Sequence, residues 1–115
     1  ADDVVFTFNT LLEKGHPFYK AYYGDVKEDK AEGKLRVRFT FKVAGNRELP
    51  IIMGQMPVLP KHFFEGKDFS ATTLQPVLGS GPYRVKSVDA GRKIVYERVK
   101  DWWGKDLGVA RGRFN

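Results

Sequence analysis

The chain has 115 residues, the size of one domain, and 42% of them are hydrophobic, which is enough apolar material to build a core. It has no cysteine, which excludes disulfides, thiolate metal sites and cysteine nucleophiles. Its 20 Lys and Arg against 14 Asp and Glu give a net charge of +6, yet these basic residues are scattered among acidic ones, which favours a solvated surface over a nucleic-acid or lipid patch.

An amphipathic helix is predicted first, from roughly Asp3 to Lys14. Asp2 and Asp3 are good N-cap residues, and one apolar stripe follows at helical spacing, comprising Val4, Val5, Phe8, Leu11 and Leu12. Gly15 is expected to take a left-handed conformation after the last turn, and Pro17 then prevents continuation. The first residues read as the cap of a helix already under way, and no signal peptide or membrane span is recognisable. The chain is therefore interpreted as a piece whose targeting sequence lies upstream.

A dense aromatic cluster, residues 18–23, follows this break. Two interpretations are open for it. The first is that two or three of the rings cover the core, which is the commoner role of such side chains. The second is that some rings line a ligand cleft, where rigid amphipathic rings supply contact area at low entropic cost. Packing is the preferred interpretation.

The clearest predicted strand covers residues 35–43, where apolar and polar residues alternate. A turn signal at Gly33 predicts an antiparallel partner before it. The polar face carries Arg36, Arg38 and Lys42, but the aromatic residues that a nucleic-acid platform needs lie on the opposite face. A solvated outer face is therefore preferred.

A short helix is predicted after Asn46, which serves as its cap, with Pro50 in its first turn. Its apolar residues at helical spacing are Leu49, Ile52, Met53 and Met56. The two methionines are interpreted as core filling, with an adaptable ligand surface as the alternative. Residues 57–60 must run extended because both prolines fix φ, and one helical turn follows at residues 61–65.

A β-hairpin is predicted from two strands, 83–88 and 93–99, which flank a short connection ending in Gly91. An irregular segment, residues 67–78, precedes it and reads as a surface connection or as a boundary between subdomains. Two glycines and a proline bend the chain before the first strand, and the aromatic pair Trp102-Trp103 ends the second.

No catalytic or metal-binding pattern is recognisable, so the sequence predicts a protein that is not an enzyme and has no metal site. His16 and His62 are far apart with no metal-ligand spacing, and structural or surface roles are preferred. Gly79-Ser80-Gly81 lacks the following Lys-Ser/Thr and the helix of a phosphate loop. The G-x-S-x-G pattern of a nucleophile elbow is absent.

Five short elements occur in a fixed order along essentially the whole chain: Asp2–Phe8, Leu35–Lys42, Pro57–His62, Gly79–Tyr83 and Tyr96–Gly104. Together they resemble the motifs of the extracytoplasmic solute-binding proteins of family 5, the peptide- and nickel-binding group that delivers ligand to ABC importers. Ser80 stands where the family's Gly-Thr-Gly-Pro-Tyr motif has threonine, and Trp102 where its Asp-Tyr-Trp-Gly ending has tyrosine. Residues 46–50 and 111–115 resemble more particularly the oligopeptide and microcin C binding subgroup.

This resemblance implies an α+β fold with an antiparallel sheet, an N-terminal amphipathic helix and short helical turns. Family members are several times longer, with two lobes that close on ligand. The chain is therefore implied to be a single folded fragment, residues 1–115, of the first lobe of a two-lobed periplasmic binding protein (type II, cluster C-like). Residues 1–78 would form most of its small subdomain, and residues 79–115 a hairpin and tail of its main sheet.

The implied function is periplasmic capture of oligopeptides and their delivery to ABC transporter permease subunits at the membrane. The implied partners are the oligopeptide ligand, the permease and the remainder of the full-length chain, with no nucleic acid. Family members have no catalysis of their own and need no cofactor for peptide transport.

Five residues resemble positions that face the ligand cleft in relatives. They are three aromatic residues after the first helix and two residues before the Pro-x-x-Pro turn, namely Phe18, Tyr19, Tyr22, Gln55 and Met56. The aromatic residues around the hairpin are instead assigned to packing: Tyr83, Trp102 and Trp103.

The alternative from another class is a free-standing basic module that binds nucleic acid. Its contacts would come from Arg36, Arg38, Lys42 and the tail residues Arg111 and Arg113. Such binding depends on phosphate contacts and weakens steeply as salt rises, whereas peptide capture does not.

Overall fold

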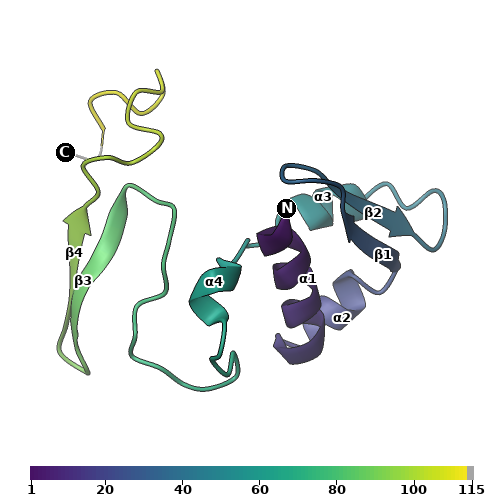
Figure 1. Ribbon diagram of the computed structural model, residues 1–115, viewed down its shortest axis with the longest axis horizontal. Helices are drawn as coiled ribbons and strands as arrows, with labels where there is room; N and C mark the ends of the chain where they lie inside the picture. The colour runs from purple at the N-terminus through teal and green to yellow at the C-terminus, as the bar shows by residue number, and fades with distance from the viewer. Residues whose placement is uncertain (114–115) are drawn as a thin grey trace. The chain divides into compact units, whose positions relative to one another are not determined.

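The computed structural model describes residues 1–113, and the chain divides into two compact units. The first unit covers Ala1–Ala71 and the second begins at Thr72. Figure 1 labels the elements of the first unit, α1 (Asp2–Lys14), α2 (Phe18–Tyr22), β1 (Val26–Ala31), β2 (Val37–Phe41), α3 (Leu49–Gly54) and α4 (Lys61–Phe64). The second unit contains β3 (Tyr83–Asp89) and β4 (Lys93–Arg98). Over these described residues the chain is a small α+β protein with two antiparallel two-stranded sheets, the class that the sequence predicts.

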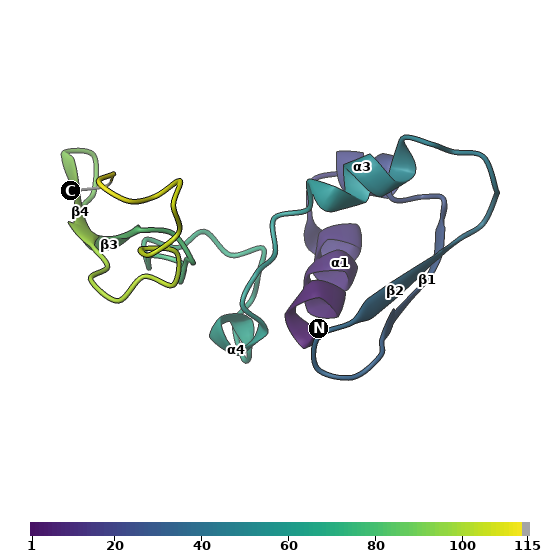
Figure 2. The same cartoon turned by 90° about the horizontal axis from the view of Figure 1, so that it is seen from above.

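Helix α1 is the centre of the first unit. It contacts β1, α2 and α4, and in Figures 1 and 2 it lies between α4 and the β1–β2 hairpin. Its apolar stripe buries Phe8 and Leu11. The other members of this core are Tyr23, Val26, Leu49 and Met56. The predicted N-terminal helix is therefore confirmed, and the rest of the unit packs around it.

Both ends of α1 differ in detail from the prediction. Asp2 and Asp3 lie in the first turn, where their charge complements the helix dipole, and neither side chain caps the helix. Gly15 has a φ of −78°, so the predicted left-handed conformation is wrong. Glycine is needed there for a different reason, because a Cβ would lie 2.5 Å from the carbonyl oxygen of Leu11.

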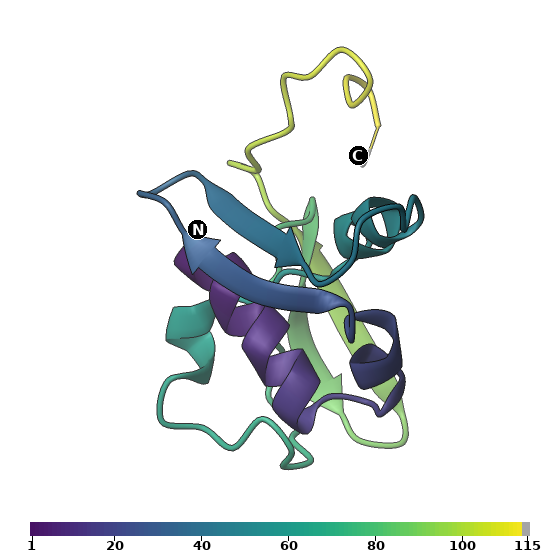
Figure 3. The ribbon, with the colours of Figure 1, turned by 90° about the vertical axis from the view of Figure 1, so that its right-hand side faces the viewer.

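Strands β1 and β2 pair antiparallel beside α1, as Figure 3 shows. Val26 pairs with Phe41, and the register shifts before Glu28. Phe39 and Phe41 pack against the core, as the alternating pattern predicts. Leu35 does not, because it lies before the strand and is 98% exposed. The strand is therefore shorter than predicted.

The predicted helix after Asn46 is present, but its N-cap is Glu48, and Asn46 instead holds the turn that precedes it. Asn46 Oδ1 accepts hydrogen bonds from the backbone N–H groups of Glu48 and Leu49, both at 3.1 Å. Pro50 lies in the first turn of α3, where its missing N–H costs nothing. The helical turn predicted after Pro60 is also present, as α4.

A buried hydroxyl ties the proline-rich segment to α1. Thr7 is completely buried, and its Oγ1 accepts a hydrogen bond from the backbone N–H of Leu59 at 2.8 Å and donates to the Asp3 carbonyl oxygen at 2.6 Å. One turn earlier, Asp3 Oδ1 accepts from the backbone N–H of Lys61, the first residue of α4, at 2.8 Å. We call these contacts the Thr7–Asp3 clamp. They join parts of the chain that are 52 and 58 residues apart.

The second unit is built on the predicted hairpin. Strands β3 and β4 pair antiparallel, and Gly91 has a φ of 75° in the connecting turn, as expected. The indole N–H groups of Trp102 and Trp103 both donate to the carbonyl oxygen of Ser80, at 2.8 and 2.9 Å. The glycine-rich entry and the aromatic exit of the hairpin are thereby held together.

In the part of the chain that the structure describes, no helix has the length and hydrophobicity needed to cross a membrane. The subgroup likeness predicted at residues 111–115 includes Phe114 and Asn115, which lie outside the described residues.

Thr7→Val is expected to lower the free energy of unfolding by about 1–3 kcal/mol, because the variant keeps the shape of the side chain but leaves the Leu59 N–H without its acceptor. Urea unfolding followed by circular dichroism measures the change. Thr7→Ser keeps the hydroxyl and serves as the matched control, with a smaller loss expected. Equal losses in the two variants would contradict the role given to the hydroxyl.

Candidate functional site

Helix α2 presents aromatic rings on two sides. Side chains four residues apart share one face of a helix, so Phe18 stacks near Tyr22 and Tyr19 near Tyr23. The ring centroids are 6.3 Å apart in the first pair and 5.6 Å apart in the second. The first pair faces solvent and the second faces the core. Tyr19 and Tyr23 thus cover the core, the role preferred for the aromatic cluster, whereas Phe18 and Tyr22 are exposed.

The solvent-facing side carries three rings. Phe18 and Tyr22 are 63% and 55% exposed. His16 extends the row, with its ring centroid 4.6 Å from that of Phe18 and its Nδ1 accepting the Phe18 N–H at 3.3 Å. We call His16, Phe18 and Tyr22 the outward aromatic stripe. Adjacent exposed rings of this kind suit contact with a ligand that has an apolar portion.

The inward side anchors the helix. Tyr23 is buried, with its ring 5.5 Å from that of Phe8, and Tyr19 packs against the same core. Burial raises the pKa of the Tyr23 phenol above its usual range, and the neighbouring Tyr19 adds to this effect. Tyr23 is thus a neutral packing residue at ordinary pH.

The other two predicted site residues follow α3. Gln55 is exposed, whereas Met56 is buried as a member of the core. Figures 2 and 3 place α2 and α3 on the same side of α1. The structure thus exposes three of the five predicted residues, Phe18, Tyr22 and Gln55, and packs the other two, Tyr19 and Met56.

A hollow of about 220 Å³ in the first unit has no counterpart in the sequence predictions. It is lined by three aromatic rings together with polar and charged side chains: Phe6, Phe64, Phe69, Thr10, Glu13, Lys14 and Lys67. The Phe6 and Phe64 ring centroids lie 6.1 Å apart. Phe6 is absent from the apolar stripe that predicted α1, and only the fold brings Phe64 to it. The one available signal was the density of phenylalanine at residues 63–69.

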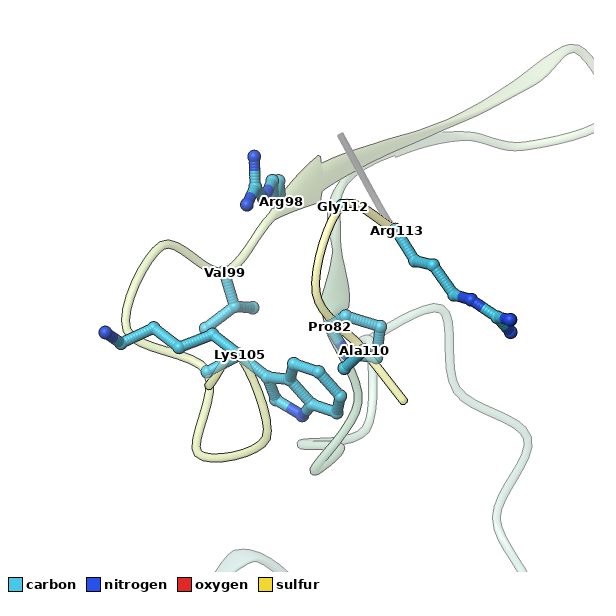
Figure 4. Close-up of a pocket in the computed structure, with 8 residues that line it drawn as sticks. Pro82, Arg98, Val99, Lys105, Ala110, Gly112 and Arg113 are labelled. Carbon is cyan, nitrogen blue, oxygen red and sulfur yellow. The ribbon is translucent and has the colours of Figure 1, made fainter. Parts of the chain in front are cut away.

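A smaller pocket lies in the second unit. Its volume is about 50 Å³, enough for a few water molecules, and its apolar lining comprises Pro82, Val99, Trp102 and Ala110. Figure 4 shows Arg98, Lys105 and Arg113 around it, with their charged ends directed away from it. This pocket is too small to hold a peptide side chain of ordinary size.

Two of the aromatic residues predicted to pack around the hairpin, Trp102 and Trp103, contact each other with ring centroids 5.4 Å apart. The Trp102 ring lies against Gly104, where a Cβ would come within 2.6 Å of it. Trp103 is nevertheless 72% exposed, and Tyr83 is 40% exposed.

The basic residues in and beside β2 do not form a free row for phosphate groups. Arg38 Nε lies 2.8 Å from Glu32 Oε1, and Lys42 Nζ donates to the Gly24 carbonyl oxygen at 2.6 Å. The tail arginines invoked with them belong to the second unit. The nucleic-acid alternative thus gains no support.

Within residues 1–113, no group of three or more His, Asp and Glu side chains is arranged to hold a metal ion.

Comparison with known proteins gives a match over nearly the whole chain. The model of the bacterial extracellular solute-binding proteins, family 5 middle region, matches residues 1–112. A Brucella melitensis protein whose name gives it a binding role is 49% identical over 112 residues, 96% of this chain. Two Agrobacterium fabrum proteins are also similar. The peptidoglycan-binding protein YepA is 45% identical over 107 residues, 92% of the chain, and YejA, named as a probable peptide-binding protein, is 41% identical over 121 residues, 99% of the chain.

The matched relatives are much longer than this chain. It spans 18% of the Brucella protein, 17% of YepA and 20% of YejA. The similarity covers both units, so they occur together in the same region of those proteins.

Tyr23→Phe is expected to reduce the loss of stability at alkaline pH. The raised pKa means that the unfolded chain releases this proton at a lower pH than the folded chain does. The contribution of Tyr23 to the free energy of unfolding is fully present below the unfolded-state pKa of about 10. It is lost as the pH rises through the higher folded-state pKa.

Urea unfolding at a series of pH values on both sides of the tyrosine pKa measures this difference. Tyr22→Phe, which changes an exposed tyrosine, is the control and should follow the wild type. The same pH dependence in wild type and Tyr23→Phe would contradict the assignment.

Proposed function

This chain belongs to the bacterial extracellular solute-binding proteins of family 5, and we propose that it forms part of the peptide-binding component of an ABC importer. In this proposal the complete gene product captures an oligopeptide between two lobes in the periplasm and delivers it to permease subunits in the membrane. The observation that carries the proposal is the family match over residues 1–112, and a relative named for peptide binding supports it.

The outward aromatic stripe gives this proposal a candidate contact surface. Phe18 and Tyr22 stand on a helix whose opposite side is anchored in the core, so their rings are held in place before ligand arrives. Preorganised rings lose little conformational entropy on binding. Gln55 adds an exposed amide, which can both donate to and accept from a peptide backbone.

The proposed mechanism is capture without chemical change to the ligand. Apolar contacts supply affinity, and a few polar groups fix the orientation of the peptide. Closure of two lobes then encloses it, a hinge motion of the kind seen in periplasmic binding proteins. Within the outward aromatic stripe, the His16 ring packs against Phe18 and its Nδ1 accepts the Phe18 N–H.

A second candidate ligand is a peptide derived from peptidoglycan. The 45% identity to YepA favours it, and so does the distribution of charge. Residues 72–115 carry nine Lys and Arg against four Asp and Glu, whereas residues 1–71 carry eleven against ten. The stem peptides of peptidoglycan bear free carboxylates, which a positively charged surface attracts.

Phe18→Ala and Tyr22→Ala are each expected to raise the Kd of the complete gene product for its peptide ligand by roughly tenfold, because aromatic anchors at interfaces commonly contribute more than 1 kcal/mol. Isothermal titration calorimetry with defined oligopeptides and peptidoglycan stem peptides measures the change. Leu35→Ala is the matched control, since Leu35 is also a large apolar residue in the first unit and is 98% exposed. Unchanged affinity in both aromatic variants would refute the contact surface.

Tyr19 and Met56 need milder substitutions, because alanine at either position would also damage the core. Tyr19→Phe and Met56→Leu preserve the packing volume while changing the polar or polarisable group. A weaker affinity at unchanged stability would support direct contact with ligand. Unchanged affinity in both variants and in Gln55→Ala would limit the surface to the outward aromatic stripe.

Raising the ionic strength is expected to weaken binding of an anionic stem peptide severalfold between roughly 0.01 and 0.15 M salt, because the Debye length shrinks over this range. A neutral oligopeptide of the same length is the control and should bind with nearly constant affinity. Equal salt dependence for the two ligands would contradict the role given to the positive charge.

A further inference from the structure

One side of α1 that does not face the core lines the hollow of about 220 Å³. Phe6, Thr10 and Lys14 follow one another at intervals of four residues, so they share one side of the helix, and Glu13 lies beside them. Phe8, which belongs to the core, lies two residues from Phe6 and therefore on nearly the opposite side. The helix thus uses one side for packing and contributes the other to the hollow.

Two further rings come from α4 and the segment that follows it. The ring of Phe64, the last residue of α4, stacks on Phe6 with a centroid separation of 6.1 Å and an interplanar angle of 27°. Its centroid is also 5.5 Å from that of Phe69. All three rings are half-buried in the first unit. Grouped rings that stay partly open offer apolar contact area to another aromatic ring.

Charged side chains of both signs also line the hollow. Lys14 and Lys67 each bring an ammonium group, and Glu13 brings a carboxylate. Among residues 1–113, none of these three side chains forms an ion pair. Lys67 Nζ lies 3.6 Å from the centroid of the Phe63 ring, and this cation–π contact restrains it. Two positive groups and one negative group are therefore available to a ligand.

The size of the hollow limits what can enter it. Pockets for drug-sized ligands have volumes of roughly 300–1,000 Å³, and this hollow is smaller, at about 220 Å³. One aromatic ring with short polar substituents suits such a volume better than an oligopeptide does. The lining residues also differ from those of the outward aromatic stripe, so the hollow is a separate candidate site.

We propose that this hollow binds a free aromatic amino acid in its zwitterionic form. The ligand ring lies among the three phenylalanine rings, its α-carboxylate faces Lys14 and Lys67, and its α-ammonium group faces Glu13. Charge complementarity is the argument for this ligand, because a zwitterion uses charges of both signs around the hollow. The inference goes beyond peptide capture, since it assigns a second and smaller ligand to another part of the first unit.

Isothermal titration calorimetry of the complete gene product with L-phenylalanine tests this ligand. L-Alanine keeps both charges but lacks the ring, and it is expected to bind at least about tenfold more weakly because the apolar contacts are lost. Phenethylamine lacks the carboxylate and 3-phenylpropionate lacks the ammonium group. Each is expected to bind about two- to fivefold more weakly than L-phenylalanine, because pairs between exposed charges contribute modestly.

Variants of the hollow show where L-phenylalanine binds. Thr10→Phe places a ring of the protein itself in the hollow and is expected to raise the Kd at least about tenfold, because it occupies the space of the ligand ring. Glu13→Gln and Lys14→Gln each remove one exposed charge and are expected to raise the Kd about two- to fivefold. Lys20→Gln is the matched control, because Lys20 is an exposed lysine of the same unit that does not line the hollow.

Several results would overturn the proposal. One is the absence of saturable L-phenylalanine binding up to about 10 mM, a concentration that would fill most of a site with millimolar Kd. Another is unchanged affinity in a Thr10→Phe variant that retains its native circular dichroism spectrum, because the ligand would then lie elsewhere. Phenethylamine or 3-phenylpropionate binding as tightly as L-phenylalanine would exclude recognition of the zwitterion.

A peptide titration of Thr10→Phe distinguishes this proposal from peptide capture. The affinity for oligopeptide is expected to stay unchanged in this variant, because the outward aromatic stripe is intact. A weaker oligopeptide affinity would show that the hollow belongs to the peptide site, and it would contradict a separate ligand. Loss of L-phenylalanine binding with intact oligopeptide binding is the result that we expect.

Discussion

The first unit depends on how one proline-rich segment satisfies its backbone amides. Pro57 and Pro60 have no N–H, so residues 57–60 cannot join a sheet ladder, and the amides beside the prolines need other acceptors. Helix α1 supplies them through the Thr7–Asp3 clamp. Thr7 Oγ1 accepts a hydrogen bond from the Leu59 N–H, and Asp3 Oδ1 accepts one from the Lys61 N–H. The clamp fixes the start of α4, and α4 in turn places Phe64 beside Phe6. A single buried hydroxyl thus connects the N-terminal helix to structure more than fifty residues later.

In each unit, one side of an element packs or pairs within the unit and the other side is exposed. In α2, the inward pair of tyrosines anchors the helix, which holds the outward aromatic stripe in place. In the second hairpin, Arg84 and Lys86 pair with Glu97 on one face, whereas Ile94 and Tyr96 on the other face are more than half exposed. The first arrangement suits ligand contact, and the second suits assembly into a larger fold. Together they agree with a chain that is one region of a longer solute-binding protein.

Periodicity predicts the regular elements of this chain well. The stripe that includes Phe8 and Leu11 predicts α1, and the alternation around Phe39 predicts β2, because repeated burial on one side leaves a direct mark on the sequence. Close approaches leave no such mark: Gly15 resembles a left-handed cap, although it is needed for space beside Leu11. The same limit applies to the candidate site. A dense aromatic run identified α2, but only the fold separates its exposed rings from its buried ones and adds the hollow around Phe6.

We propose that these residues are a region of a longer, periplasmic, peptide-capturing protein. The most direct test is to raise an antibody against this chain and to measure the size and compartment of the native protein in its source cells. We expect a band several times larger than the 13.1 kDa of this chain, released by osmotic shock together with the periplasmic contents. A cytoplasmic band of the same small size, retained on nucleic acid at low salt, would contradict it.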